Sequence, residues 1–178
     1  MSSFTFYDGT VPHATAAINV LLHLFNKIEA HASSLSSSVD TLISARLAED
    51  MLPFSLQVFI ASEMALQMAV HLQGLEPPTG QPGPDGLKTL EDMRKRVHTV
   101  LELLQKSDRQ KFIDAETEIT FNVGPEKKAT ANAHSYANGF ALPNLYFHTV
   151  TAYNILRKHG VQVGKTDYLN HYLGGYLF

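Results

Sequence analysis

The stretch Leu142–Gly160 constrains the fold of this chain more than any other part of the sequence. Pro143 suits the first turn of a helix, where an N–H group is not needed, and Gly160 suits the left-handed position that ends one. Between them the predicted helix is apolar on most sides, with one histidine, His148, near its middle. Such a helix must be largely buried, and a buried imidazole needs a hydrogen-bond partner or a function.

Three earlier segments also have the apolar spacing of helices. The first covers Val11–Ala32, and the second opens at Asp50–Pro53 and runs to about Leu72. The third follows Thr89, which with Asp92 resembles a capping box, and runs to about Lys106. Four helices of this length predict a four-helix bundle.

The segments between these helices complete the predicted domain. Gly74–Asp85 is a Pro- and Gly-rich connector long enough to cross the whole bundle. Glu116–Val123 alternates like a strand, and Lys128–Ala133 can return beside it as a small hairpin. We therefore expect a single domain over residues 1–178, an all-α four-helix bundle with a small β-hairpin between helices three and four.

Composition excludes several classes of protein. With 44% hydrophobic and 17% charged residues the chain is an ordinary globular sequence, and its net charge of -3 offers no basic surface for nucleic acid or an anionic membrane. Cysteine is absent, so disulfides, thiolate metal sites and a cysteine nucleophile are excluded. No signal peptide or run of about 18 apolar residues is present. We expect a cytoplasmic protein with no membrane partner.

One arrangement of the helices predicts a candidate site. If the helices run alternately up and down, His31, Gln57 and His148 meet at one end of the bundle. Zinc, nickel or iron favours imidazole ligands with open positions for water. In this hypothesis His31 and His148 bind the metal or act as acid and base, and Gln57 orients substrate or water.

Two alternatives to this site remain open. The long connector also allows helix three to run parallel to helix two, which would carry His148 to the opposite end. In addition, Gln57 and His148 can form a hydrogen-bonded pair that is purely structural.

Other polar residues are assigned by their position on the predicted helices. Asp50 lies just outside the proposed site, and Tyr146 and Tyr153 share a helix face, so we expect all three to line a substrate pocket unless the two tyrosines are core packing. We expect His71 at the surface or rim, and Arg94–Arg96 as a solvated basic face.

Several stretches carry a family resemblance. Leu47–Gln57, Leu142–His148, Thr151–Arg157 and the segment after His159 resemble an uncharacterised family shared by fungi and bacteria. That family is placed in the DinB/YfiT-like superfamily of helical bundles, and the resemblance covers nearly the full length.

The resemblance implies a specific metal site. Many members of the superfamily bind a divalent metal through one histidine on helix two and two histidines spaced i and i+4 on helix four, and some relatives are thiol-dependent transferases or isomerases. His148 matches the first helix-four position, whereas Ala152 and Gln57 occupy the other two. We also expect the protein to form a homodimer.

These observations support two functional hypotheses. The first is a divalent-metal-dependent enzyme that acts on a small molecule in a pocket at one end of the bundle. The second is a metal-free small-ligand-binding or protein-interaction scaffold, in which His148 and Gln57 are a structural core pair.

Overall fold

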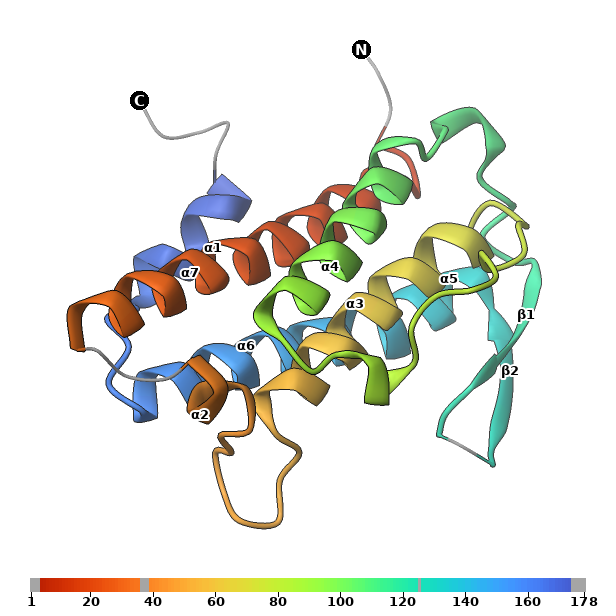
Figure 1. The fold of residues 1–178 in the computed structure, drawn as a ribbon. Coiled ribbons are helices and arrows are strands. Elements are labelled where there is room, and N and C mark those ends of the chain that lie inside the picture. The colour runs from red at the N-terminus through yellow and green to blue at the C-terminus, as the bar shows by residue number, and fades with distance from the viewer. Residues whose placement is uncertain (1–3, 36–38, 125, 174–178) are drawn as a thin grey trace.

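The chain folds into a helical bundle with one hairpin (Figure 1). The computed structural model describes residues 4–35, 39–124 and 126–173. The long helices are α1 (Val11–Leu35), α3 (Phe54–His71), α4 (Leu90–Gln105) and α6 (Leu142–Lys158). The shorter elements are α2 (Val39–Ile43), η1 (Pro84–Gly86), η2 (Arg109–Lys111), β1 (Glu118–Asn122), β2 (Lys128–Asn132), α5 (Ala133–Tyr136), η3 (Ala137–Ala141) and α7 (Lys165–Leu173). The predicted bundle with its small hairpin is confirmed.

Contacts at the helix ends define the directions of α1, α3 and α4. Arg94, near the start of α4, lies 3.0 Å from Glu29 near the end of α1, so these two helices are antiparallel. The ends of α3 and α4 meet instead, because the Gln73 amide donates to the Ser107 hydroxyl over 3.1 Å. Helix α4 is therefore parallel to α3, which is the second of the two arrangements that the sequence left open.

The connector between α3 and α4 makes this parallel pair possible. It returns along the bundle to the start of α4, as Figure 1 shows. A Cβ at Gly86 would lie 2.9 Å from the Cβ of Pro82, so the tight turn there needs glycine. The predicted capping box then starts α4: the Thr89 hydroxyl accepts from the Asp92 N–H, and the Asp92 carboxylate accepts from the Thr89 N–H.

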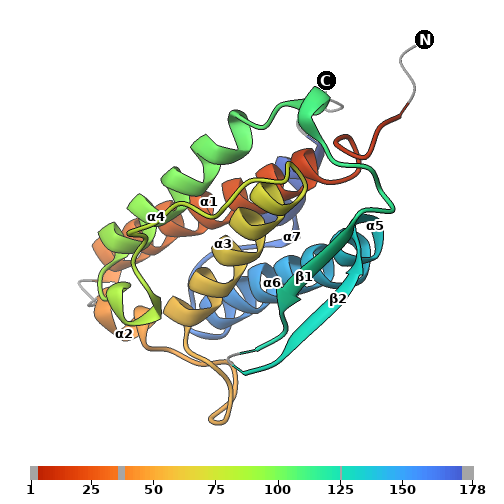
Figure 2. The ribbon, with the colours of Figure 1, turned by 90° about the vertical axis from the view of Figure 1, so that its right-hand side faces the viewer.

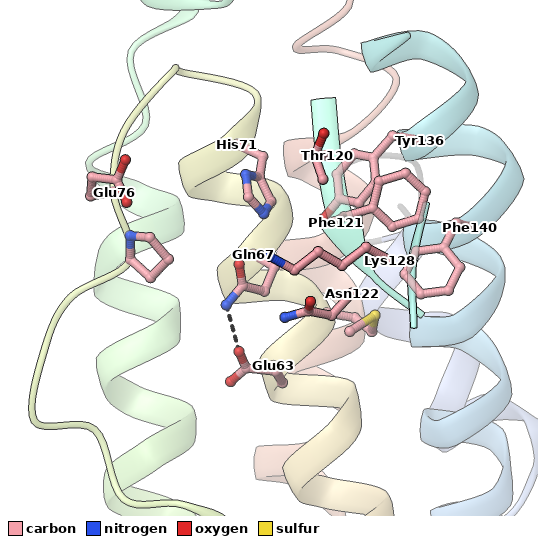
Figure 3. A pocket seen from close by; sticks show the side chains of 12 residues that line it. Glu63, Gln67, His71, Glu76, Thr120, Phe121, Asn122, Lys128, Tyr136 and Phe140 are labelled. Atoms are coloured by element: carbon pink, nitrogen blue, oxygen red, sulfur yellow. Dashed lines mark hydrogen bonds between the residues drawn. The ribbon is translucent and has the colours of Figure 1, made fainter. Parts of the chain in front are cut away.

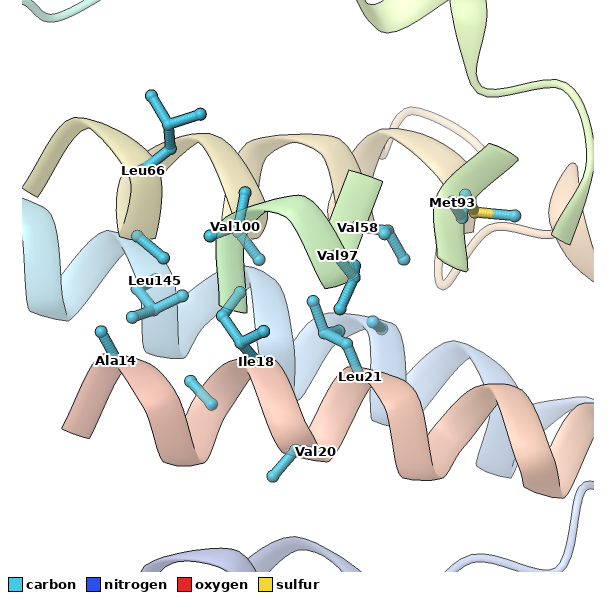
Figure 4. Close-up of a cluster of buried hydrophobic side chains, with 14 of the residues drawn as sticks. Ala14, Ile18, Val20, Leu21, Val58, Leu66, Met93, Val97, Val100 and Leu145 are labelled. Carbon is cyan, nitrogen blue, oxygen red and sulfur yellow. The ribbon is translucent and has the colours of Figure 1, made fainter. Parts of the chain in front are cut away.

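The four long helices share one apolar core (Figure 4). Side chains such as Ile18 on α1, Val58 on α3, Val97 on α4 and Leu145 on α6 are completely buried. Burying a side chain of this size contributes roughly 1.5–3 kcal/mol, so this core is the main source of the bundle's stability.

The hairpin packs beside α5 and α6 at one side of the bundle (Figure 2). Its strands are antiparallel, with Asn122 opposite Lys128. The ring of Phe121 lies 4.8 Å from the ring of Tyr136 and 4.9 Å from that of Phe140, measured between centroids. These ring contacts attach the hairpin to the bundle, as a two-stranded ribbon requires.

The helical run that carries His148 starts earlier than Pro143. Helix α5, the π-helical turn η3 and α6 follow one another without a break from Ala133. The Leu142 N–H donates to the Ala137 carbonyl five residues back, so the turn before Pro143 is wide. A wide turn accommodates a proline within the run, because the proline ring would otherwise clash with a carbonyl of the preceding turn.

The C-terminal helix α7 packs on α1. The Asp167 carboxylate lies 2.7 Å from His23 Nε2 and 3.0 Å from Lys27 Nζ. Among the described residues, no helix has both the length and the apolar composition needed to cross a lipid bilayer.

Candidate functional site

His148 is held by Gln57, as the sequence predicted. The Nδ1 atom of His148 lies 2.6 Å from Gln57 Oε1. The amide nitrogen of Gln57 donates to the Leu52 carbonyl over 2.9 Å. Because the amide uses its N–H group on Leu52, its oxygen must accept from His148, and Nδ1 carries the proton.

This hydrogen bond determines what the imidazole presents to its surroundings. With the proton on Nδ1, the other ring nitrogen, Nε2, carries a lone pair. Burial lowers the pKa of His148 to about 4, so the ring is neutral at neutral pH. Nε2 makes no hydrogen bond to any residue that the structure describes, and it is available as an acceptor.

His148 lines an open pocket of about 630 Å³ between α3, the hairpin and α6. Most of its walls are apolar, and its polar groups are few. The lining residues are Leu56, Phe59, Ile60, Glu63, Met64, Pro84, Asn122, Val123, Gly124, Phe140, Asn144 and His148. We call this cavity the His148 pocket.

A second cavity of about 370 Å³ adjoins the first and is more polar (Figure 3). Glu63, Met64, Asn122 and Phe140 line both cavities. The second cavity adds Gln67, His71, Glu76, Pro77, Thr120, Phe121, Lys128 and Tyr136, and we call it the Lys128 cavity. His71 therefore lines a cavity, which agrees with the surface or rim position expected from the sequence.

Glu63, at the boundary of the two cavities, is held on both carboxylate oxygens. Arg96 donates to one oxygen over 2.5 Å, and Gln67 donates to the other over 2.6 Å. Arg96 is only 2% exposed, and it also donates to the Ser62 hydroxyl and the Pro82 carbonyl. The negative charge of Glu63 is therefore balanced by a buried cation and held in one place.

The expectation that Arg94–Arg96 forms a solvated face is wrong for Arg96. Successive residues on a helix are about 100° apart, so a run of three charges cannot lie on one side. Arg96 follows Met93 by three residues and precedes Val100 by four, and both of these are buried. That spacing was the sequence signal that could have identified Arg96 as inward-facing.

His31 is not part of the His148 pocket. Its ring lies at the far end of α6, where Cε1 is 3.7 Å from the position of a Cβ on Gly160. Gly160 comes 12 positions after His148, which corresponds to roughly 18 Å along a helix. The two imidazoles therefore cannot bind one ion in this structure. The physical reason is the parallel pairing of α3 and α4, which makes α6 run parallel to α1.

The three residues expected to line a substrate pocket are also elsewhere. Asp50 is exposed in the segment between α2 and α3. Tyr146 and Tyr153 lie about 200° and 140° around the helix from His148. Tyr146 faces α7, where its ring centroid is 6.1 Å from that of Tyr172. None of the three lines either cavity.

The donor groups beside His148 do not fit the three-histidine metal site that the resemblance implies. Ala152, four residues on, is completely buried in the core. Gln57, in the helix-two position, already uses both its amide oxygen and its amide nitrogen within the protein. Within residues 4–35, 39–124 and 126–173, no three His, Cys, Asp or Glu side chains are placed to share an ion.

The fold places the chain among DinB-like helical bundles. Over 92% of its length it is similar to the crystal structure of a DinB family member protein from Shewanella denitrificans, with a TM-score of 0.81 and 35% sequence identity, and the match covers 90% of that chain. Residues 6–169 match the model of the domain of unknown function DUF1993. The chain belongs to the DUF1993 family. No curated protein matches it.

Proposed function

We propose that this protein binds a small, mostly apolar molecule in the His148 pocket, and that His148 Nε2 accepts a hydrogen bond from it. The observation that carries the proposal is the hydrogen bond from His148 Nδ1 to Gln57, which leaves Nε2 with a lone pair and no partner among the described residues. An apolar pocket with one or a few well-placed polar groups is typical of small-molecule sites, where the polar group orients the ligand.

We favour binding without a metal over the metal-dependent enzyme that the sequence also suggested. A neutral imidazole with a free Nε2 is a suitable metal ligand, but a zinc site needs further protein ligands. The donor set around His148 supplies none of the histidines that the superfamily site would add. Elemental analysis of protein purified without chelator tests this choice, and stoichiometric zinc, nickel or iron that is lost in His148→Asn would contradict it.

Two matched probes test the hydrogen bond to His148. p-Cresol has an apolar ring and one hydroxyl donor, whereas toluene has the ring alone. We expect p-cresol to bind more tightly than toluene, because its hydroxyl donates a hydrogen bond to His148 Nε2. The same bond should shift the ¹⁵N resonance of Nε2. The difference between the probes should vanish in His148→Phe and persist in His98→Gln, a control on the exposed side of α4.

Two results would contradict the proposal. One is equal binding of p-cresol and toluene to the wild-type protein. The other is a preference for p-cresol that survives in His148→Phe. A thermal unfolding scan of each variant identifies loss of fold as the cause of any loss of binding, since a ligand that binds only the native state raises its melting point.

A further inference from the structure

The His148 pocket continues into the Lys128 cavity. The two share Glu63, Met64, Asn122 and Phe140 as common walls, so no complete wall divides them. A ligand that fills the first cavity can extend into the second. The inference below rests on the proposed function, because it concerns the other end of the same ligand.

Lys128 brings an unpaired positive charge to the second cavity. Its side chain extends from the hairpin over the cavity toward Gln67 on α3 (Figure 3). No ion pair or side-chain hydrogen bond joins it to another residue in the described part of the chain. Its neighbour Lys127 is also exposed but lines neither cavity.

Tyr136 supplies a second polar group without a partner. The residue is only 1% exposed, and it lines this cavity. Its hydroxyl makes no hydrogen bond to the residues that the structure describes. Burial, with a contribution from Glu63, raises the pKa of this hydroxyl, so it stays protonated and can donate. Because the hydroxyl has no protein partner among the described residues, it can donate to a ligand or to water in the cavity.

The remaining titratable groups of the cavity are His71, Glu63 and Glu76. The His71 ring meets the Tyr136 ring edge-on with centroids 5.5 Å apart, and burial lowers the pKa of His71. The charge of Glu63 is balanced by Arg96. Glu76 lies on the connector at the rim and is exposed. These two carboxylates disfavour a doubly charged anion and leave Lys128 to balance one negative charge.

We infer that the Lys128 cavity binds the carboxylate of a monocarboxylic acid whose apolar body lies in the His148 pocket. The ammonium of Lys128 pairs with the carboxylate, and the Tyr136 hydroxyl donates to it. Charge-assisted hydrogen bonds of this kind are stronger than neutral ones and define which end of the ligand enters the cavity. The ligand class is therefore an amphipathic acid whose aliphatic or aromatic body carries a hydroxyl donor for His148 Nε2.

Two series of matched probes test the charge. The first is omega-hydroxyoctanoate, omega-hydroxyoctanamide and omega-hydroxyoctylamine, and the second is p-hydroxyphenylpropanoate, p-hydroxyphenylpropanamide and p-hydroxyphenylpropylamine. All of them carry a hydroxyl donor for His148 Nε2, and within each series they differ only at the other end. In calorimetric titrations at neutral pH we expect each acid to bind about tenfold more tightly than its amide, with the amine weakest. In Lys128→Gln the acid should fall to the affinity of the amide, whereas Lys127→Gln, the matched control, should keep the preference.

The outcomes separate this inference from the proposed function. If each amide binds as tightly as its acid, or if the preference survives in Lys128→Gln, the inference is wrong, while loss of amide binding in His148→Phe still supports the proposed function. If an acid binds with full affinity to His148→Phe, the proposed function is wrong. Absence of binding by both series at millimolar concentration overturns the inference. Tyr136→Phe, which keeps the ring, should weaken the acids more than the amides, because the bond to a carboxylate is the stronger one.

Discussion

His148 keeps a neutral imidazole at neutral pH because packing removes water from the ring. Its hydrogen-bond partner, Gln57, is uncharged and therefore cannot favour the protonated form as a carboxylate would. The same amide orients the ring and leaves Nε2 without a proton, as an acceptor on a side chain that lines the pocket. The contact with Gln57 thus both determines which ring nitrogen carries the proton and keeps the ring in place.

This burial predicts a pH dependence of stability. The unfolded chain takes up a proton on His148 below its ordinary pKa of 6.5, whereas the native ring does so only near pH 4. The unfolded state therefore binds more protons between these values, and the free energy of unfolding falls as the pH drops through this window, by up to about 3 kcal/mol. His148→Asn lacks this contribution.

Urea unfolding at pH 7 and pH 4.5 measures the effect. We expect wild-type protein to lose about 2 kcal/mol more than His148→Asn between these conditions, because all other titrating groups are common to both. Equal losses in the two proteins would show that His148 is not buried as the structure describes.

Some of the residues of the candidate site could be predicted from the sequence. The pairing of Gln57 with His148 could be predicted, because both are polar residues on apolar helix faces. Which ring nitrogen of His148 carries the proton could not be predicted. It depends on the bond from Gln57 to the Leu52 carbonyl, and the helical pattern does not give the position of that carbonyl. Lys128 and Tyr136 were also missed, because only the packing of the hairpin brings them to the same cavity as α3.

Individual helices and the hairpin follow local signals closely. The capping box at Thr89 and the alternation around Ile119 gave the correct positions of α4 and β1. Pro143 lies in the first turn of α6, as the sequence predicted, but α5 and the wide turn η3 before it were not predicted, and they run into α6 without a break. A proline marks a helix start only when no wide turn precedes it.

One carboxylate, that of Asp167, links helix α7 to α1 through His23 and Lys27. Burial alone would raise the pKa of Asp167, but hydrogen bonds from the Gly164 N–H, His23 and Lys27 lower it to about 2. We expect Asp167→Ala to increase amide hydrogen exchange across Lys165–Leu173 by removing these bonds, while exchange in α3 stays unchanged. The measurement is exchange detected by mass spectrometry.

Asp50→Ala is the control for this experiment, since Asp50 is an exposed carboxylate in a loop. It should leave the exchange of α7 as it is in the wild-type protein. Unchanged protection of α7 in Asp167→Ala would mean that the aromatic contacts among Tyr146, Tyr168 and Tyr172 are sufficient to hold the helix.

The arrangement of the whole molecule depends on the direction of α4. The connector was recognised as long enough for either direction, and periodicity within a helix carries no information about its orientation. The observed direction separates His31 from His148 and leaves the His148 pocket without a second imidazole. The homodimer and the cytoplasmic location expected from the sequence stay predictions.

Arg96 links α4 to α3 and to the connector, which the direction of α4 brings close together. It lies on α4, donates to Ser62 and Glu63 on α3 and to Pro82 in the connector, and stacks on the Phe59 ring with 4.4 Å to its centroid. We expect Arg96→Met to lower the free energy of unfolding by about 2–4 kcal/mol, because it leaves Glu63 partly buried without a counter-charge. Urea denaturation measures this change.

A matched control and a double variant show whether that loss of stability comes from the ion pair. Lys95→Met removes an exposed charge one residue away and should cost no more than about 0.5 kcal/mol. Combining Glu63→Gln with Arg96→Met should recover part of the loss, because the unpaired charge is then absent. A loss in the double variant as large as the sum of the single losses would contradict the role of the ion pair.

The position of α6 has a consequence for how the chain reaches this structure. Helix α6 packs against both α1 and α3, although it is made after both of them. As the polypeptide leaves the ribosome, the apolar faces of α1 and α3 therefore stay partly uncovered until residues 142–158 emerge. Growing chains with uncovered apolar faces are the species that aggregate or engage chaperones. The last long helix to be synthesised is the one that closes the fold and completes the pocket.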